Sequence, residues 1–350
     1  MPPHAATAAA NGIGRSSVGA APRPRVWSEV GPLRTVLVHR PCGELRMVAG
    51  DPRRALFSAA VSDAEAGAEH DAFTAALRAQ GVEVLYLRDL LADVTRDRRR
   101  AGLLTHWLPN LMYPRDPSVW IGDGVALGEL AMPVRRRESD LFARVYRDHP
   151  RFAGAPRLTP AGTSPPGMEG GDVLVAGAGR VIVGAGARTT SEGAGRVARA
   201  LIEARAAAEV AILDVPHRAG FHLDLVMTMV DRDKVAIRRG LRGQLRGQLW
   251  RARRSSIRVD PLPDPLLAFP EPVEAIELEE PRSTGDPLSW DHGVNVLAVS
   301  PGRVISYAHN ERSNERLSAA GIEVIAIRGS ALARGRGGPR CLTCPLIRDP

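Results

Sequence analysis

Apolar and polar positions recur along the chain in the order of two short strands, a helix and a third strand. Residues 171–215 show this order most clearly, because DVLVAGAGRVIVG is followed by the helical pattern SEGAGRVARALIEARA and the apolar run EVAILDVP. Residues 293–330 repeat it with GVNVLAVSPGRVISY, NERSNERLSAAG and IEVIAIRGS, and GRVI stands at the same place in both. A period near two predicts strands and one near 3.6 predicts a helix. The pattern therefore predicts repeated ββαβ units.

Two weaker versions of the unit precede these. One begins with TVLVHRP and continues through HDAFTAALRAQ and VEVLYLRDLL, and the other reads SVWIGDGVALGEL and MPVRRRESDLFARVYRDH. A doubly wound sheet is the ordinary alternative, but the glycine turns within each unit require antiparallel strand pairs, which that arrangement lacks. We therefore predict an α/β fold in which ββαβ units form a ring, as in a pseudo-symmetric propeller.

Two segments fall outside the repeat. Residues 1–25 are small, free of acidic residues and without periodicity, which predicts a disordered N-terminal tail before a single catalytic domain over residues 26–350. In the irregular stretch 238–289, Leu241, Leu245 and Leu249 recur every fourth residue among arginines. This spacing indicates a basic amphipathic helix, whose arginine face is either solvated or a surface for RNA or membrane; two interior glycines weaken the helix.

Composition narrows the class of protein. The 350 residues are 44% hydrophobic and 25% charged, which is typical of a globular chain, and arginine, proline or glycine interrupts every apolar run. Lys234 is the only lysine among 47 basic residues, so the net charge of +8 reflects an arginine bias more than selection for a polyanion. Three cysteines, an odd number, suit a reducing compartment. We expect a cytoplasmic protein without a nucleic-acid or membrane partner.

Five residues with catalytic chemistry stand in turns or at strand ends. Cys341 follows the loop RGRGGPR, and we expect the arginines nearby to lower the pKa of its thiol and favour the nucleophilic thiolate. His222 and Asp224 open the predicted strand HLDLVMTMV, where residues two apart share a face. Glu169 in MEGGD and Asp116 in PRDP each lead into another unit. Each motif alone is compatible with an ordinary turn, but in a ring all five side chains would converge.

The combination predicts a ligand class. Carboxylates gathered around one pocket repel one another, so the expected ligand is a cation that they bridge by hydrogen bonds, and a planar guanidinium fits best. Cys341 and Cys344 also form a C-x-x-C pair, but two further zinc ligands are missing nearby, as is the strand-to-helix setting of a redox pair. No metal or organic cofactor is expected.

At these residues the chain resembles the arginine deiminase family of guanidine-modifying enzymes. The blocks SEVGPLRTVLVHRP, PRDP with WIGDGVALG, MEGGD with GARTT, HLDLVMTMVDRD, WDHGVNVLAVSPG and RGRGGPRCLTCPLIRDP occur in that family's order. The resemblance implies a five-bladed α/β propeller. It also implies a hydrolase of C–N bonds that converts L-arginine to L-citrulline and ammonia through a covalent thiouronium on cysteine.

The resemblance further implies a role for each site residue. Cys341 would be the nucleophile and His222 the acid and base. Asp116 and Asp224 would grip the guanidinium, with Glu169 steadying the histidine. The residues expected to contact the amino-acid end of the substrate are Asn110, Arg135, Arg188, Gly335 and Arg336.

One departure from that family leaves alternatives. Arginine deiminases carry a helical bundle after the first blade, whereas only VTRDRRRAGLLTHWL separates LRDLLAD from Pro109 here. The missing insert leaves assembly, including a homo-oligomer, and the size of the substrate undecided. The nearest alternatives are a hydrolase of another guanidine, such as a methylarginine or a secondary-metabolite guanidine, and an amidinotransferase that passes the amidine to an amine. An alternative of another class is a basic RNA-binding or regulatory module.

Overall fold

The protein is represented by a computed structural model that describes residues 22–159, 167–217, 219–254, 256–279 and 293–350. The expected N-terminal tail lies outside these ranges apart from its last four residues. The first three residues of the WDHGVNV block also lie outside them.

The unit predicted at residues 171–215 is present in the structure. Thr190 caps the helix, because its hydroxyl accepts a hydrogen bond from the Gly193 N–H at 3.0 Å. Val197 and Leu201, one turn apart on one helix face, are buried in the apolar core shared with the sheet. The elements are β6 (Val173–Gly177), antiparallel to β7 (Arg180–Ala185), then α5 (Ser191–Glu203) and β8 (Glu209–Asp214), parallel to β7.

The last predicted unit has the same order. Gly179 and Gly302, which precede the shared RVI sequence of the two units, have φ angles of +74° and +71°, so both hairpin turns use a left-handed glycine. The elements of this unit are β14 (Leu297–Ser300), antiparallel to β15 (Arg303–Tyr307), then α6 (Glu311–Ala319) and β16 (Glu323–Ile327), parallel to β15.

The two ends of the chain complete one unit together. Its second strand, helix and third strand come from the N-terminal part, as β2 (Leu33–Val38), α1 (Asp63–Ala79) and β3 (Glu83–Tyr86), with β2 parallel to β3. Its first strand is the C-terminal β17 (Cys344–Arg348), which pairs antiparallel with β2, while the short β1 (Arg25–Val26) pairs with the other edge of β17. The ring therefore closes directly beside Cys341.

The remaining units are less regular. The hairpin of β4 (Ser118–Ile121) and β5 (Gly124–Leu127) is followed by α4 (Arg136–Asp148), and the third strand is reduced to a single bridge between Val125 and Arg157. In the other unit, β9 (Met227–Met229) is antiparallel and β13 (Glu274–Leu278) parallel to the central β10 (Lys234–Arg238). Three short helices lie between units: α2 (Leu87–Thr95), α3 (Arg98–Thr105) and α7 (Ser330–Ala333).

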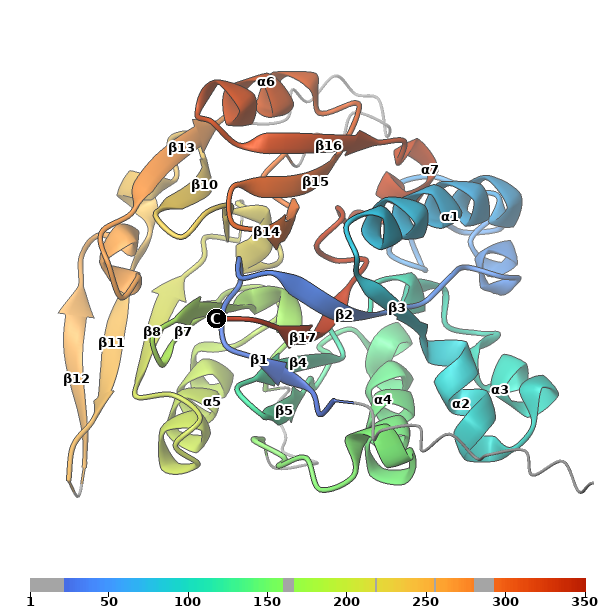
Figure 1. The fold of residues 1–350 in the computed structure, drawn as a ribbon, viewed down its shortest axis with the longest axis horizontal. Coiled ribbons are helices and arrows are strands. Elements are labelled where there is room, and N and C mark those ends of the chain that lie inside the picture. The colour runs from blue at the N-terminus through green and yellow to red at the C-terminus, as the bar shows by residue number, and fades with distance from the viewer. Residues whose placement is uncertain (1–21, 160–166, 218, 255, 280–292) are drawn as a thin grey trace, which may run out of the picture.

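The five sheets form the predicted five-bladed α/β propeller, with α1, α4, α5 and α6 on the outside of the strands (Figure 1). Three clusters of buried apolar side chains fill the space between the sheets and these helices. Among the residues that the structure describes, no helix is both long enough and apolar enough to span a bilayer.

The prediction of an amphipathic helix around Leu241, Leu245 and Leu249 is wrong. A short turn there leads into the hairpin of β11 (Arg246–Ala252) and β12 (Ile257–Leu262), which extends the sheet of β6, β7 and β8 and projects at the left of Figure 1. The three leucines are buried in the core. Pairing with β8 requires Gly247, because a Cβ there would overlap the carbonyl oxygen of Ile212, and tertiary pairing thus overrides the four-residue spacing.

Candidate active site

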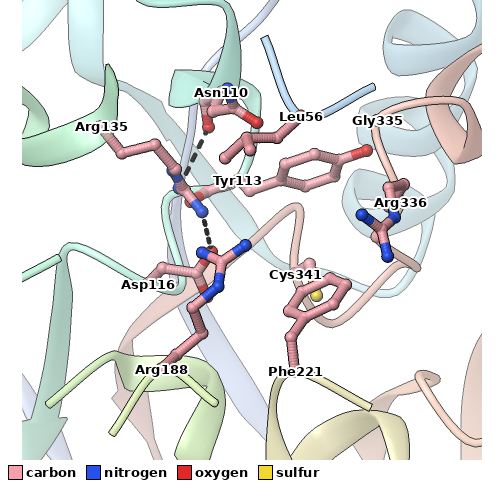
Figure 2. A pocket seen from close by; sticks show the side chains of 11 residues that line it. Leu56, Asn110, Tyr113, Asp116, Arg135, Arg188, Phe221, Gly335, Arg336 and Cys341 are labelled. Carbon is pink, nitrogen blue, oxygen red and sulfur yellow. Dashed lines mark hydrogen bonds and ion pairs between the residues drawn. The ribbon is translucent and has the colours of Figure 1, made fainter. Parts of the chain in front are cut away.

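Cys341 lies at the bottom of a pocket of about 320 Å³, in the loop between α7 and β17 (Figure 2). The residue is 3% exposed. Its N–H and that of Gly338 both donate to Asn295 Oδ1, at 3.2 and 3.1 Å, so the loop is held by a side chain from another blade. The sulfur lies 3.7 Å from Asp224 Oδ2. The predicted nucleophile therefore faces one of the predicted carboxylates.

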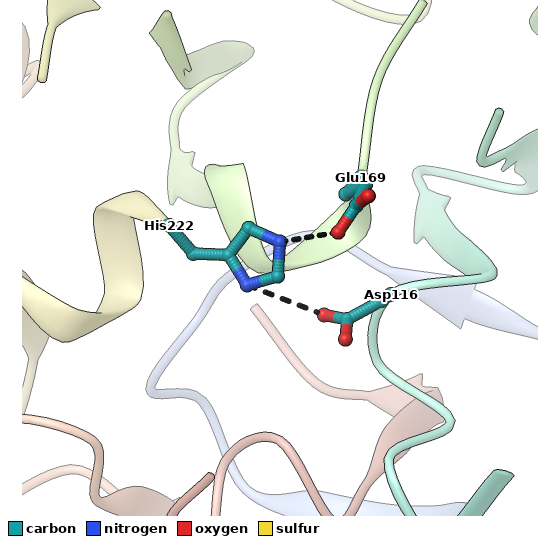
Figure 3. A group of neighbouring side chains, drawn as sticks. All are labelled: Asp116, Glu169 and His222. Carbon is teal, nitrogen blue, oxygen red and sulfur yellow. Dashed lines mark hydrogen bonds and ion pairs between the residues drawn. The ribbon is translucent and has the colours of Figure 1, made fainter. Parts of the chain in front are cut away.

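His222 lies between two further carboxylates (Figure 3). Its Nε2 is 2.6 Å from Glu169 Oε2 and its Nδ1 is 3.6 Å from Asp116 Oδ1, and all three side chains are buried. His222 and Asp224 do not begin a strand, as we expected, because a 3-10 turn over Leu223–Leu225 precedes β9. The N–H of Leu223 donates to the Asp172 carboxylate at 2.8 Å, and this bond holds the turn and the adjacent His222 in place.

The carboxylates around His222 favour its protonated form. Burial opposes the charge, but Asp116, Glu169 and Asp172 together raise the pKa of His222 to about 9. Burial likewise opposes ionisation of Glu169, yet the hydrogen bond and charge of His222 lower the pKa of Glu169 to about 2. The second oxygen of Glu169 accepts from the Ala131 N–H at 2.9 Å. At neutral pH the two groups thus form a buried ion pair in which the imidazolium can donate a proton.

Asp116 and Asp224 each have one oxygen engaged and one without a hydrogen-bond partner. Asp116 Oδ2 accepts from Arg135 Nη1 at 2.6 Å, and Asp224 Oδ2 accepts from Arg340 Nη1 at 2.7 Å. The Oδ1 atoms of both aspartates, and Nδ1 of His222, have no hydrogen-bond partner among the described residues. Buried acceptors without donors are costly, so these two oxygens are suited to a ligand that carries several N–H donors.

The pKa of the Cys341 thiol contradicts our expectation. Burial raises it well above its ordinary value, and the charges of Asp224 and Asp116 raise it further, whereas Arg340 and the Gly338 N–H lower it less. Arginines are nearby, as predicted, but carboxylates already compensate them. The isolated site therefore holds a neutral thiol, and a cation bound beside the two aspartates would favour the thiolate.

Two of the expected arginines flank Phe221 in the lining of the pocket. The guanidinium carbons of Arg188 and Arg336 lie 5.0 and 5.1 Å from the ring centre of Phe221, which stands between them in Figure 2. Arg188 also donates to Glu169 Oε2 at 3.3 Å. This pair presents two cationic groups to a ligand in the same pocket.

The other expected contact residues have structural partners of their own. Arg135 is buried and bound to Asp116 and Glu138, so it orients a carboxylate besides lining the pocket. Asn110 donates from Nδ2 to the Ala55 carbonyl oxygen at 2.9 Å. Gly335 passes so close to a tyrosine that a Cβ would overlap it. The expected site residues that line the pocket are Asn110, Asp116, Arg135, Arg188, Gly335, Arg336 and Cys341.

Sequence reasoning missed four lining residues, namely Leu56, Tyr113, Phe221 and Gly337. Three of them stood next to predicted residues, in the motifs NLMYPRDP, FHLD and RGRGG, so proximity to a motif was the available signal. Leu56 had no such signal, because it lies in a loop without periodicity and reaches the pocket with a left-handed φ of +67°.

One group in the site has the composition of a metal site. Asp116, Glu169 and His222 offer ligand atoms within 4.8 Å of one another. Because a metal binds the neutral imidazole, binding here would require the raised pKa of His222 to be overcome and its ion pair with Glu169 to be broken. The donor set therefore favours an organic cation over a metal ion.

The sequence matches known proteins over most of its length. A sequence model of the family described as "Arginine deiminase" matches residues 53–103 and 97–348. Arginine deiminase of Rhodococcus opacus (strain B4) is 36% identical over 394 residues, covering 92% of this chain and 97% of the relative. That of Mycobacterium avium (strain 104) is 36% identical over 396 residues, covering 92% and 98%. Both alignments are longer than this chain, so both relatives carry residues that it lacks, and the two matched stretches meet within α3.

Solved structures share the fold at lower identity. A dimethylarginine dimethylaminohydrolase from Pseudomonas aeruginosa complexed with citrulline has a TM-score of 0.58 at 17% identity, covering 89% of this chain and 99% of that one. SxtG, an amidinotransferase from Microseira wollei, has a TM-score of 0.64 at 17% identity, covering 93% and 98%. The family match extends across both the propeller and the pocket residues. The chain therefore belongs to the arginine deiminase family.

Proposed function

We propose that this protein hydrolyses the guanidinium group of L-arginine to L-citrulline and ammonia through a covalent thiouronium on Cys341. Family membership supports the reaction type. The observation that carries the assignment of residues is the set of two aspartates beside a buried thiol and a protonated histidine, each aspartate with one buried oxygen that accepts no hydrogen bond from the described residues.

The substrate's guanidinium would bind between Asp116 and Asp224. Each carboxylate offers an Oδ1 that accepts no hydrogen bond from the described residues, although that of Asp116 also lies 3.6 Å from His222 Nδ1. The bonded Oδ2 prevents each carboxylate from turning away. Binding brings a positive charge next to a thiol whose pKa is raised by two negative charges. The ligand thus lowers the pKa of Cys341 at the moment when the thiolate is needed.

His222 would serve as acid and then as base. The Cys341 thiol loses its proton to solvent as the guanidinium binds, and the thiolate sulfur adds to the guanidinium carbon. The tetrahedral adduct then expels ammonia with a proton from the imidazolium, and the C–N bond breaks. The imidazole, now neutral, takes one proton from a water that attacks the thiouronium carbon. The C–S bond then breaks, the new hydroxyl group gives its proton to the departing sulfur, and the ureido product is released. Glu169 holds the ring by its 2.6 Å bond throughout.

The amino-acid end of the substrate would bind near Arg188 and Arg336 in the same pocket. Arg188 and Arg336 suit an α-carboxylate because guanidinium groups bind carboxylates bidentately. Asn110, Arg135 and Gly335 line the same pocket, where they shape the space around that end. The proposed ligand is therefore a free guanidino acid, and we propose that the enzyme works in the cytoplasm, where its three free cysteines would persist.

The decisive experiment supplies purified protein with a panel of guanidines and measures ureido product and ammonia. The panel contains L-arginine, methylated arginines and decarboxylated arginine, each with and without an amine acceptor. We expect citrulline and ammonia from L-arginine in equal amounts. Amidine transfer without ammonia would identify an amidinotransferase, and preference for another guanidine would change the substrate. Failure of every guanidine, with salt-sensitive RNA binding, would contradict the proposal.

A further inference from the structure

Arg340, the residue before the proposed nucleophile, connects the candidate active site to the turn between β1 and β2. It is buried, and its guanidinium donates to three partners from different elements. Nη1 donates to Asp224 Oδ2 at 2.7 Å, Nε to Glu29 Oε1 at 2.8 Å, and Nη2 to the Val173 carbonyl oxygen at 2.7 Å. Three bonds in one plane fix the orientation of this guanidinium.

We propose that Arg340 is a positioning residue, which orients Asp224 toward the substrate's guanidinium and offsets the charge of that carboxylate beside the Cys341 sulfur, and that Glu29 holds Arg340 in place. This inference rests on the proposed function. By occupying Oδ2, Arg340 leaves Oδ1 as the oxygen available to the substrate. Arg340 therefore acts on the reaction through Asp224 and the sulfur, without touching the substrate.

Glu29 is built into the ring closure. It lies in the turn between β1 and β2, where Ser28 Oγ accepts from the N–H groups of Val30 and Gly31 at 3.1 and 3.0 Å. A Cβ on Gly31 would overlap the Asp349 carbonyl oxygen, so the turn is pressed against the chain that follows the nucleophile. The position of Glu29 is thereby coupled to that of the Cys341 loop.

Glu29 is ionised despite its burial. Burial opposes the charge, but Arg340 and Arg115 lower the pKa of Glu29 to about 2. The same network contains Arg348, which is equally buried but donates to the carbonyl oxygens of Gly31 and Ala298 at 2.6 and 2.7 Å. Arg340 therefore donates to the carboxylates of Asp224 and Glu29, whereas the hydrogen bonds of Arg348 go to backbone carbonyl oxygens. Arg348 thus serves as a buried arginine control that is not bonded to Asp224.

The charges that act on the sulfur give the inference a specific readout. The charges of Asp224 and Asp116 disfavour ionisation of the Cys341 thiol, and the charge of Arg340 favours it. Tyr113 and Tyr307 also interact with the thiol, and a negative charge on Cys341 raises the pKa of both hydroxyl groups. Removal of the Arg340 charge should therefore make the thiolate form only at higher pH. A residue with a merely structural role would not change that titration.

The test compares Arg340→Gln with Arg348→Gln, each removing one buried guanidinium. Alkylation of Cys341 by iodoacetamide is followed against pH by tandem mass spectrometry, in which fragment ions locate the modified residue and so separate Cys341 from Cys344 in the same peptide and from the exposed Cys42. We expect Arg340→Gln to raise the midpoint by about 1 pH unit and to lower kcat about 100-fold. Arg348→Gln should keep the wild-type midpoint. Glu29→Gln, which removes an anion, should lower kcat without raising the midpoint.

Arg340→Lys is a second variant for the case in which the Gln variant does not fold. Lysine keeps the charge but cannot bridge the carboxylates of Asp224 and Glu29. It should keep the alkylation midpoint near that of wild type and lower kcat. A folded Arg340→Gln protein with wild-type midpoint and turnover would overturn the inference, as would an equal shift in Arg348→Gln. Because alkylation needs no turnover, this result can be distinguished from failure of wild-type protein to form citrulline, which overturns the proposed function alone.

Discussion

His222 Nε2 and Glu169 Oε2 lie 2.6 Å apart with both side chains buried, and this contact helps the charge of Asp116 to keep the imidazole protonated. The pKa of His222 is raised to about 9 because carboxylates surround it, so the histidine remains mostly protonated below that pH. A group that would be half-neutral near pH 6.5 in a peptide is thus kept as an acid at neutral pH. The pair also links two blades, since Glu169 precedes β6 and His222 precedes β9.

Replacing Glu169 by Gln should narrow the pH range of activity. The wild-type rate depends on protonated His222 and should fall as pH rises through about 9. Removal of the Glu169 charge lowers the pKa of His222, so the fall should begin at lower pH in the variant. Profiles of kcat against pH for the two proteins test this, and coincident alkaline limbs would refute it.

The same pKa shift predicts a pH-dependent contribution to stability. Because the folded-state pKa of His222 is raised above the ordinary 6.5, its stabilising effect is fully present below pH 6.5 and is lost as pH rises through about 9. The difference in free energy of unfolding between wild type and His222→Asn should therefore shrink across that range. Urea titrations at pH 6 and pH 9.5 measure it, and a constant difference would contradict the assignment.

Cys341→Ala should abolish turnover and leave the fold intact. Loss of a covalent nucleophile removes about 10⁴-fold or more of the rate, whereas the side chain lost here is small. Cys344→Ala is the matched control, because this buried thiol contacts Ser118 and Tyr146 away from the pocket lining. Citrulline assays with circular dichroism separate the two, and citrulline release by Cys341→Ala at the wild-type rate would defeat the mechanism.

Asp116→Asn and Asp224→Asn should each impair binding and chemistry. An amide loses the charge that attracts the guanidinium, and we expect kcat/KM to fall about 100-fold or more, as when a preorganised electrostatic contact is removed. Asp71→Asn, at an exposed carboxylate paired with Arg40, is the control and should stay near wild type. Steady-state kinetics with L-arginine decide the matter, and equal small effects in all three would disprove the binding role.

Arg188→Gln and Arg336→Gln should reduce discrimination against decarboxylated arginine. If these groups bind the α-carboxylate, the preference of kcat/KM for L-arginine should fall about tenfold or more in each variant, since a charge-assisted bond contributes about 1.5–3 kcal/mol. The rate with the decarboxylated analogue should change less. An unchanged ratio of the two rates would place the carboxylate elsewhere.

Gly247→Ala should destabilise the hairpin of β11 and β12. Its Cβ would overlap the backbone of β8, and an overpacked contact costs about 1–3 kcal/mol. Gly243→Ala, where a Cβ meets nothing within 4 Å, should leave the unfolding temperature unchanged or raise it slightly. Thermal unfolding tests the pair. Specific activity of folded protein should not change in either variant, because the hairpin contributes no residue to the pocket lining.

Much of the fold and site followed from local sequence. The units containing β6–β8 and β14–β16 were predictable because alternation and helical period are local properties, and the turn glycines Gly179 and Gly302 marked their hairpins. The clustering of Cys341, His222 and Asp116 was predictable because each lies in a recognisable motif; their catalytic roles stay a prediction. The helix prediction failed at Leu241, Leu245 and Leu249 because their spacing fits a helix. Pairing with residues distant in sequence instead makes them part of a sheet and its flanking turn.

The sequence by itself determined the repeated unit, the chemical groups of the site and the family, since each depends on residues that are close along the chain. Only the tertiary structure decided how the ring closes, through β17 pairing with β2, and which charges act on the nucleophile. Glu29 and Arg340 are 311 positions apart, yet they meet at 2.8 Å. The protonation of Cys341 and His222 follows from burial and from such long-range pairs, because electrostatic energies depend on distance and desolvation in space, which no local pattern records.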